Sequence, residues 1–280
     1  MKKIPLLICI LLMGVKFVSA ATVDSIALPS RAMQKNLTCI VIKPQSYDDR
    51  NNSTKRYPVV YLLHGYSGWY SNWIIRTPEL KDLVDREQVL IVCPDGGYSS
   101  WYWDSPVDTA SRYETYIATE VPEQIDRLYR TIADRKGRAI TGLSMGGHGG
   151  IYLGFRHATF YGACGSMSGA VDLSFSKNKY DIAKRIGDTT SHKQNWYDYS
   201  AIAAIDAPLK QPLSVIIDCG LDDHLFQANR NLHEKMIRMK IPHDYIERPG
   251  KHDWNYWRNA VNYQILFFSR YFQQEAAKKS

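Results

Sequence analysis

The chain contains little cysteine, and what it has is spaced unlike a metal or redox site. Five cysteines occur in 280 residues, and no two of them form a C-x-x-C pair. This argues against zinc and thioredoxin-like redox sites. For the protein as a whole we expect neither a metal nor a cofactor. Cys9 lies in the N-terminal apolar run. The other four are interpreted as buried thiols, although an oxidising compartment would permit a disulfide among them: Cys39, Cys93, Cys164 and Cys219.

Internal repeats, low-complexity linkers and blocks of basic residues are also absent from the sequence. Scattered basic residues argue against a nucleic-acid site. The composition, with 22% charged and 45% hydrophobic residues, is that of an ordinary globular protein and excludes a disordered or fibrous one. The length allows one large α/β domain or two small ones, and we expect one domain over residues 21–280.

The first twenty residues have the pattern of a secretory signal peptide. Lys2 and Lys3 precede an apolar run over residues 4–15, and residues 18–20 supply the small side chains that signal peptidase needs. A membrane anchor is the alternative, but the run is shorter than the roughly 20 residues of a membrane span. We therefore expect cleavage after Ala20, a secreted or periplasmic protein, and no integral membrane segment in it. Loss of three lysines would lower the formal charge from +7 to +4.

Short apolar runs alternate with helical patterns along the rest of the chain. Runs typical of strands covered on both faces lie at 37–43, 58–63, 88–94, 137–142 and 213–219, with a weaker one at 243–248. Apolar residues at helical spacing occur at 114–130, 224–239 and 255–272. This alternation predicts an α/β fold, with a mostly parallel central sheet and helices on both faces. The longer polar stretch at 169–200 is expected to cross the sheet edge.

A G-x-S-x-G motif over residues 142–146 follows the predicted strand 137–142. In such a motif the chain turns sharply from strand to helix, which raises the serine hydroxyl above the sheet, and the glycines avoid Cβ clashes. The motif alone is weak, and a structural glycine-rich turn is the alternative. The strand before it and the small-residue helical segment after it favour Ser144 as a nucleophile.

A serine nucleophile needs a base, and in this fold an acid and then a histidine follow it along the chain. Both must lie beyond the carboxyl ends of strands. His252, just after the predicted strand 243–248, meets this condition, whereas the other histidines beyond the motif lie in helical segments or before that strand. Asp222 and Asp223 both follow the strand 213–219, and their spacing does not separate them. Asp218 lies within the strand and is assigned a structural hydrogen bond.

Two further features complete the expected site. The backbone N–H groups of Met145 and Tyr66 are predicted to stabilise an oxyanion, while His64 is assigned a structural role at its strand end. Aromatic residues pack cores more often than they bind ligands, but three clusters follow strands at one sheet edge, near residues 69–73, 101–103 and 254–257. The candidates for substrate binding are Trp101, Trp103, Trp254 and Trp257.

Five segments resemble the putative-esterase family, which includes esterase D (S-formylglutathione hydrolase), feruloyl and acetyl-xylan esterases, and mycolyltransferases. They are YLLHGYSG, PDGGYSSWYWDSP, RAITGLSMGGHGG, DCGLDDHLF and PGKHDWNYW. The resemblance covers nearly all of the chain after the signal and implies an α/β-hydrolase fold. It implies a Ser144–His252–Asp223 triad, since the G-x-x-D pattern of the family places the acid on Asp223, and oxyanion donors at Tyr66 and Met145.

The resemblance implies a cofactor-free serine esterase that removes feruloyl or acetyl groups from carbohydrates, since the most similar branch is the secreted carbohydrate esterases. Acyl transfer to a sugar would use the same acyl-enzyme with another acceptor. An S-formylglutathione-type thioesterase fits poorly with export. A non-catalytic carbohydrate-binding protein would have no need of Ser144, Asp223 and His252 together.

Overall fold

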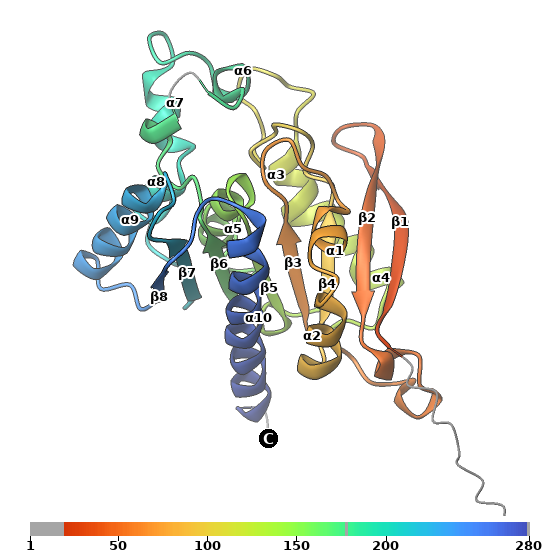
Figure 1. Ribbon diagram of the computed structural model, residues 1–280. Coiled ribbons are helices and arrows are strands. Elements are labelled where there is room, and N and C mark those ends of the chain that lie inside the picture. Colours follow the sequence, from red (N-terminus) through yellow and green to blue (C-terminus); the bar gives the residue numbers. More distant parts are fainter. Residues whose placement is uncertain (1–19, 177–178, 279–280) are drawn as a thin grey trace, which may run out of the picture.

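The structure, a computed structural model, describes residues 20–176 and 179–278. The predicted signal peptide, residues 1–20, lies outside the described residues except for Ala20. The described residues form an eight-stranded sheet of order β1-β2-β4-β3-β5-β6-β7-β8 (Figure 1). Strands β3 to β8 are parallel to one another, whereas β1 and β2 pair antiparallel at one end. The predicted fold class, a mostly parallel sheet with helices on both faces, is confirmed.

The strands coincide with the apolar runs of the sequence in six of eight cases. The strand bounds are β1 Thr22–Ser30, β2 Lys35–Lys43, β3 Val59–Leu63, β4 Leu90–Pro94, β5 Arg138–Gly142, β6 Ala163–Met167, β7 Ser214–Gly220 and β8 Asp244–Arg248. Every residue of β3, β4, β5 and β6 is buried. Burial on both faces explains why these strands do not alternate between apolar and polar residues.

Strand β6 was not expected from the sequence because four of its five residues are small. A Cβ on its Gly165 would lie 2.1 Å from Oε1 of Gln264, which belongs to a helix on one face of the sheet. On the other face, a Cβ on Gly150 would lie 2.2 Å from the Gly165 carbonyl oxygen. Close packing on both sides thus requires small residues, which lack the β-branched pattern used to recognise strands. Strand β1 was also missed, because it lies at the sheet edge and is largely exposed or half-buried.

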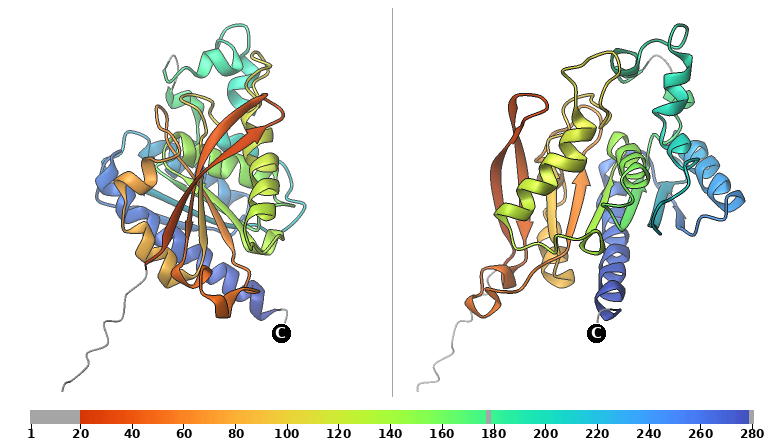
Figure 2. Two further views of the ribbon diagram at one scale, coloured as in Figure 1. Left: turned by 90° about the vertical axis from the view of Figure 1, so that its right-hand side faces the viewer. Right: turned by 180° about the vertical axis from the view of Figure 1, so that it is seen from behind.

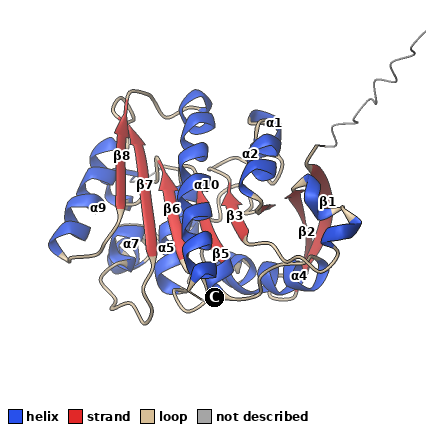
Figure 3. Ribbon diagram, turned by 90° about the horizontal axis from the view of Figure 1, so that it is seen from below, coloured by secondary structure: helices blue, strands red, loops and turns tan. Residues whose placement is uncertain are grey.

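Helices cover both faces of the sheet (Figures 2 and 3). The helix bounds are α1 Asn72–Arg76, α2 Leu80–Glu87, α3 Tyr113–Thr115, α4 Val121–Leu128, α5 Met145–Arg156, α6 Ile182–Ile186, α7 Lys193–Asp198, α8 Ala201–Ala204, α9 Phe226–Arg238 and α10 Trp254–Ala277. A π-helical turn, Tyr116–Glu120, joins α3 to α4 within the predicted helix 114–130, and short 3-10 turns occur at Gln45–Tyr47, Arg50–Asn52, Arg135–Gly137 and Leu173–Ser176.

Two hydrophobic cores hold these layers together. Side chains of α1, α2 and α10 form one core against the sheet, and those of α4, α5 and α9 form the other. Leu232 of α9 and Phe268 of α10 are fully buried, and burying such a side chain contributes roughly 1.5–3 kcal/mol. The four cysteines interpreted as buried thiols are buried and free. None of the helices in the described ranges combines the length and apolar character that crossing a membrane requires.

The carboxyl ends of the parallel strands meet at one edge of the sheet, which is uppermost in Figure 1. The segment that carries α6 and α7 lies above this edge, and it belongs to the stretch 169–200 that was predicted to cross the sheet edge. Loops that follow β3, β5, β7 and β8 therefore converge beneath it.

Candidate active site

Ser144 occupies a sharp turn between β5 and α5. Its backbone has φ 54° and ψ −114°, a conformation that costs energy for any residue with a Cβ. The turn is held by hydrogen bonds: Ser144 N–H donates to the Met167 carbonyl over 3.0 Å, and its own carbonyl accepts from Ala170 N–H over 3.2 Å.

The two glycines of the motif allow the turn to pack against β3. A Cβ on Gly142 or on Gly146 would lie 2.6 Å from the carbonyl oxygen of Leu63, which is closer than real Cβ atoms approach such a group. Strand and helix can therefore approach β3 only if these positions lack side chains. The hydroxyl of Ser144 stands at the carboxyl edge of the sheet as a result.

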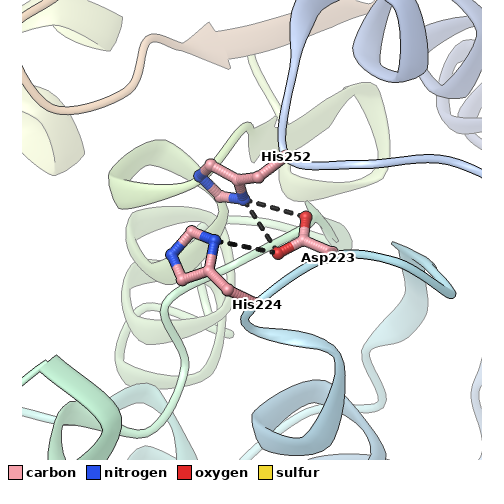
Figure 4. A group of neighbouring side chains, drawn as sticks. All are labelled: Asp223, His224 and His252. Atoms are coloured by element: carbon pink, nitrogen blue, oxygen red, sulfur yellow. Dashed lines mark hydrogen bonds and ion pairs between the residues drawn. The ribbon is translucent and has the colours of Figure 1, made fainter.

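The structure brings together the three residues assigned to a triad. Nε2 of His252 lies 2.9 Å from Oγ of Ser144, and Nδ1 of His252 lies 2.8 Å and 3.0 Å from the two carboxylate oxygens of Asp223. Figure 4 shows the carboxylate facing the imidazole. The three residues follow β5, β7 and β8, so they meet only when these strands are assembled. The chain of hydrogen bonds can carry a proton from the hydroxyl to the imidazole.

Burial and hydrogen bonding act in opposite directions on Asp223. Burial of its side chain favours the neutral acid, but hydrogen bonds from His252 and from Leu225 N–H hold the pKa of Asp223 below its usual value. The carboxylate is therefore charged at neutral pH and stabilises a positive imidazole. The neighbouring Asp222 is exposed, and its N–H donates to the Gly250 carbonyl. Of this pair, Asp223 is the residue that contacts His252.

Two backbone N–H groups near Ser144 donate no backbone hydrogen bond within the part of the chain that the structure describes. Met145 is the first residue of α5, so its N–H has no acceptor within the helix. Tyr66 lies in the loop after β3, and its N–H makes no backbone hydrogen bond in the described part of the chain. A Cβ on Gly65 would approach the Leu143 side chain to 2.6 Å, so this loop passes close to the turn.

His64 and Asp218 have the structural roles expected of them. Nε2 of His64 accepts from Gly96 N–H over 2.8 Å, and its Nδ1 contacts the Gly65 carbonyl over 2.8 Å. Burial lowers the pKa of His64, so it is neutral. Asp218 accepts hydrogen bonds from Arg248 and from the Tyr256 hydroxyl.

A cavity of about 390 Å³ opens beside Ser144 and His252. Three of the four predicted aromatic candidates line it: Trp101, Trp254 and Trp257. Trp103 does not. It is fully buried, stacks on Trp101 with ring centroids 5.4 Å apart, and contacts the ring of His148. Its place behind Trp101 indicates a supporting role for Trp103.

Sequence reasoning missed other residues of the cavity wall, among them Asn72, Arg76, Tyr180 and His224. His224 was assigned to the start of a helix over 224–239, but α9 begins at Phe226 and leaves His224 in the loop. Its position directly after Asp223 was the available signal. Asn72 and Arg76 carried no motif, and their role depends on where α1 packs.

Asp223, His224 and His252 place three ligand-type atoms within 4.8 Å of one another (Figure 4). Such atoms can bind a metal ion. In this site, however, the hydrogen bonds to Ser144 and Asp223 already engage both ring nitrogens of His252. Hydrogen bonding within the site therefore accounts for the cluster.

Comparisons with known proteins agree with this geometry. The family model described as "Putative esterase" matches residues 30–268. The acetyl esterase of Caldicellulosiruptor saccharolyticus is 27% identical over 251 residues, which are 83% of this chain and 92% of that protein. A solved ferulic acid esterase has a TM-score of 0.78 and 29% identity, covering 90% of this chain and 98% of its own.

The S-formylglutathione hydrolase (FrmB) of Staphylococcus aureus has a TM-score of 0.75 at 20% identity, over 90% of this chain and 100% of its own, a likeness of fold alone. The family match covers most of the chain, and similar proteins of near-equal length carry esterase names. The chain belongs to the putative-esterase family of α/β-hydrolases and is a carboxylic ester hydrolase.

Proposed function

We propose that the protein is an exported serine esterase in which Ser144, His252 and Asp223 form the catalytic triad. The observation that carries this proposal is the hydrogen-bond chain from Ser144 Oγ through the His252 ring to Asp223, with distances of 2.9 Å and 2.8 Å. Geometry of this kind identifies a triad by role and not by sequence position.

In the proposed reaction, Ser144 Oγ attacks the ester carbonyl carbon while His252 Nε2 takes the hydroxyl proton. Asp223 stabilises the resulting imidazolium and holds the ring in its tautomer. The N–H groups of Met145 and Tyr66 receive the negative charge that develops on the carbonyl oxygen, and one such donor contributes about 2.7–4 kcal/mol.

His252 then returns the proton to the departing alcohol, which leaves an acyl-enzyme on Ser144. Water, activated by His252, attacks this ester and releases the acid. Both halves use the same residues, so the chain needs no further chemical group for this reaction.

For the substrate, we propose a short acyl or hydroxycinnamoyl ester of a carbohydrate. Of the tryptophans that line the cavity, the half-buried Trp254 offers a flat apolar face to a sugar ring or a phenolic acid, whereas Trp101 and Trp257 are almost fully buried and form part of the cavity wall. The relatives named acetyl esterase and ferulic acid esterase support the same substrate class. The predicted signal peptide would place the protein where polymer fragments arrive.

The test compares kcat/KM for acetylated xylo-oligosaccharides, methyl ferulate, feruloylated arabinose and S-formylglutathione on the purified protein. We expect one of the carbohydrate or ferulate esters to be the best substrate. A clear preference for the glutathione thioester would contradict the proposed substrate class and would leave the signal peptide without a purpose.

A further inference from the structure

Helix α1 presents a polar face to the cavity. Asn72 and Arg76 are four residues apart on this helix, so they lie on one side of it, and both line the cavity. Trp73, the residue after Asn72, is buried, and its ring meets that of Trp254 with ring centroids 5.2 Å apart. This packing fixes α1 with its Asn72–Arg76 face toward the substrate space.

The amide of Asn72 is oriented by the loop before α1. Its Oδ1 accepts a hydrogen bond from Trp69 N–H over 3.0 Å. A Cβ on Gly68 would lie 2.4 Å from this oxygen, so the loop closes tightly on it. With the oxygen engaged, the Nδ2 group and its two hydrogens remain for the cavity. Asn72 is thus a donor on this wall.

Arg76 is a cation without a partner in the part of the chain that the structure describes. No hydrogen bond or ion pair of its guanidinium occurs among these residues. The nearby Glu79, three residues further on, pairs instead with Arg258. Arg76 therefore keeps all five N–H donors for solvent or a ligand.

No acidic residue balances this cation within the cavity. The described residues that line it include two histidines and Arg76, but neither Asp nor Glu. Asp223 is buried behind the His252 ring, and Asp181, which accepts from the Tyr66 hydroxyl, is paired with Lys184. One wall of the cavity thus offers donors and a fixed positive charge with no counter-ion.

We propose that Arg76 and Asn72 bind a carboxylate carried by the substrate, so that the protein prefers acidic esters to neutral ones. This inference rests on the proposed esterase function and narrows its substrate class. The planar guanidinium fits a carboxylate with two parallel hydrogen bonds, and Asn72 adds a neutral donor beside it. The carboxylate belongs either to the alcohol, as in an acylated uronic acid, or to the acyl group, as in a dicarboxylic half-ester.

Two pairs of esters test the preference and distinguish these sources. On the alcohol side, an acetylated methyl glucuronoside is compared with its uncharged glucuronamide. On the acyl side, monomethyl succinate is compared with methyl succinamate. Each pair differs only in acid against amide, so the ratio of their kcat/KM values measures recognition of the charge. We expect a ratio of about tenfold in one pair, falling as salt rises.

Variants assign the preference to the α1 face. Arg76→Gln should bring the ratio close to one. Asn72→Asp keeps an acceptor for Trp69 N–H but places a negative charge beside Arg76, so it should lower the ratio too. Arg127→Gln is the matched control, because it removes one exposed arginine that does not line the cavity and should leave the ratio unchanged.

Binding to Ser144→Ala, followed by NMR titration with methyl glucuronoside, monomethyl succinate and their amides, tests the inference without turnover. Tighter binding of one acid that is lost in the double variant with Arg76→Gln supports it. Equal binding of acid and amide, or equal kcat/KM in both pairs, overturns it and leaves the esterase proposal standing. Absence of hydrolysis of every ester tested, with selective acid binding retained, contradicts the esterase proposal alone.

Discussion

His224 lies edge-on against His252, with the two ring centroids 4.5 Å apart and the rings inclined by 66°. Its Nδ1 is 3.6 Å from Oδ1 of Asp223. Burial, and then the charge of His252 when protonated, lowers the pKa of His224 below its usual 6.5. A second imidazole beside the proposed base is therefore neutral at pH 7. His224 therefore places no positive charge beside the imidazolium that forms on His252 during the proposed reaction.

This arrangement predicts different effects for two substitutions of His224. His224→Lys would place a permanent positive charge beside the developing imidazolium, and we expect kcat/KM to fall by about tenfold or more. At roughly 5 Å and an effective dielectric constant near 20, two unit charges repel by about 3 kcal/mol, and exposure reduces this further. His224→Gln is uncharged and should cost much less. Equal losses for both variants would show that the charge of this residue does not matter.

Ser144→Ala should yield a folded protein without esterase activity. The hydroxyl contributes little to packing, but its loss removes the nucleophile. Because the triad residues act as a unit, the effects of substituting them are not additive, and one substitution is enough to abolish activity. Activity is measured on a chromogenic ester and folding by circular dichroism. Residual activity within tenfold of the wild type, in a protein with an unchanged spectrum, would exclude Ser144 as the nucleophile.

The aspartate pair provides a matched comparison for the acid. Asp223→Asn should lower kcat by several orders of magnitude, since removal of a triad acid costs roughly 10⁴ in a well-studied case. Asp222→Asn removes the same charge from the preceding residue, whose side chain is exposed, and should have a small effect. His252→Ala should be as damaging as Ser144→Ala. Reversed effects of the two aspartate variants would reject the assignment of Asp223.

Folding stability should decrease in mild acid because of His148. This histidine is fully buried on α5, contacts the Tyr199 carbonyl through Nε2 over 2.9 Å, and burial lowers its pKa to about 4. The unfolded chain binds a proton at this residue near pH 6.5 and the folded protein only near pH 4, so the unfolded state gains stability as the pH falls through this range. The full effect is about 3 kcal/mol.

Urea unfolding of the wild type and His148→Phe between pH 7.5 and 4.5 measures this dependence. This substitution keeps an aromatic ring beside Trp103 and Tyr152 and removes the titrating group, although the hydrogen bond to Tyr199 is lost. We expect the variant to lose less stability on acidification, whatever its stability at neutral pH. Parallel curves for the two proteins would assign the acid sensitivity to other groups, such as His64.

The features predicted best from the sequence are those that local chemistry defines. The glycines around Ser144 are required by a turn whose clashes involve backbone atoms, so the motif is visible in the chain itself. The position of His252 beside Ser144 could be predicted because a base in this fold is expected to follow a strand. Asp223 could not be separated from Asp222 by spacing alone, and the family pattern was needed to choose it.

The features that were missed depend on packing between distant segments. Strand β6 has small residues because α5 and α10 pack closely against its two faces, and neither contact can be recognised from the residues near β6 in the sequence. Trp103 and Trp101 are near neighbours in sequence with similar loop settings, yet one lies behind the other. Arg76 reaches the cavity from α1, and the position of α1 depends on long-range contacts such as that of Trp73 with Trp254, 181 residues further along the chain.

The strand that precedes His252, β8, lies at one edge of the sheet. Among the described strands, β8 pairs with β7 alone and is exposed or half-buried along its length, whereas β5, which precedes Ser144, is buried throughout. Fraying at this edge would separate base from nucleophile while both hydrophobic cores stay intact. Warming should therefore abolish activity reversibly at temperatures below that of global unfolding. The amide protons of β8 should also exchange with solvent faster than those of β5. The working temperature range of the catalyst is then set by one ladder of peripheral hydrogen bonds and not by the strength of the fold as a whole.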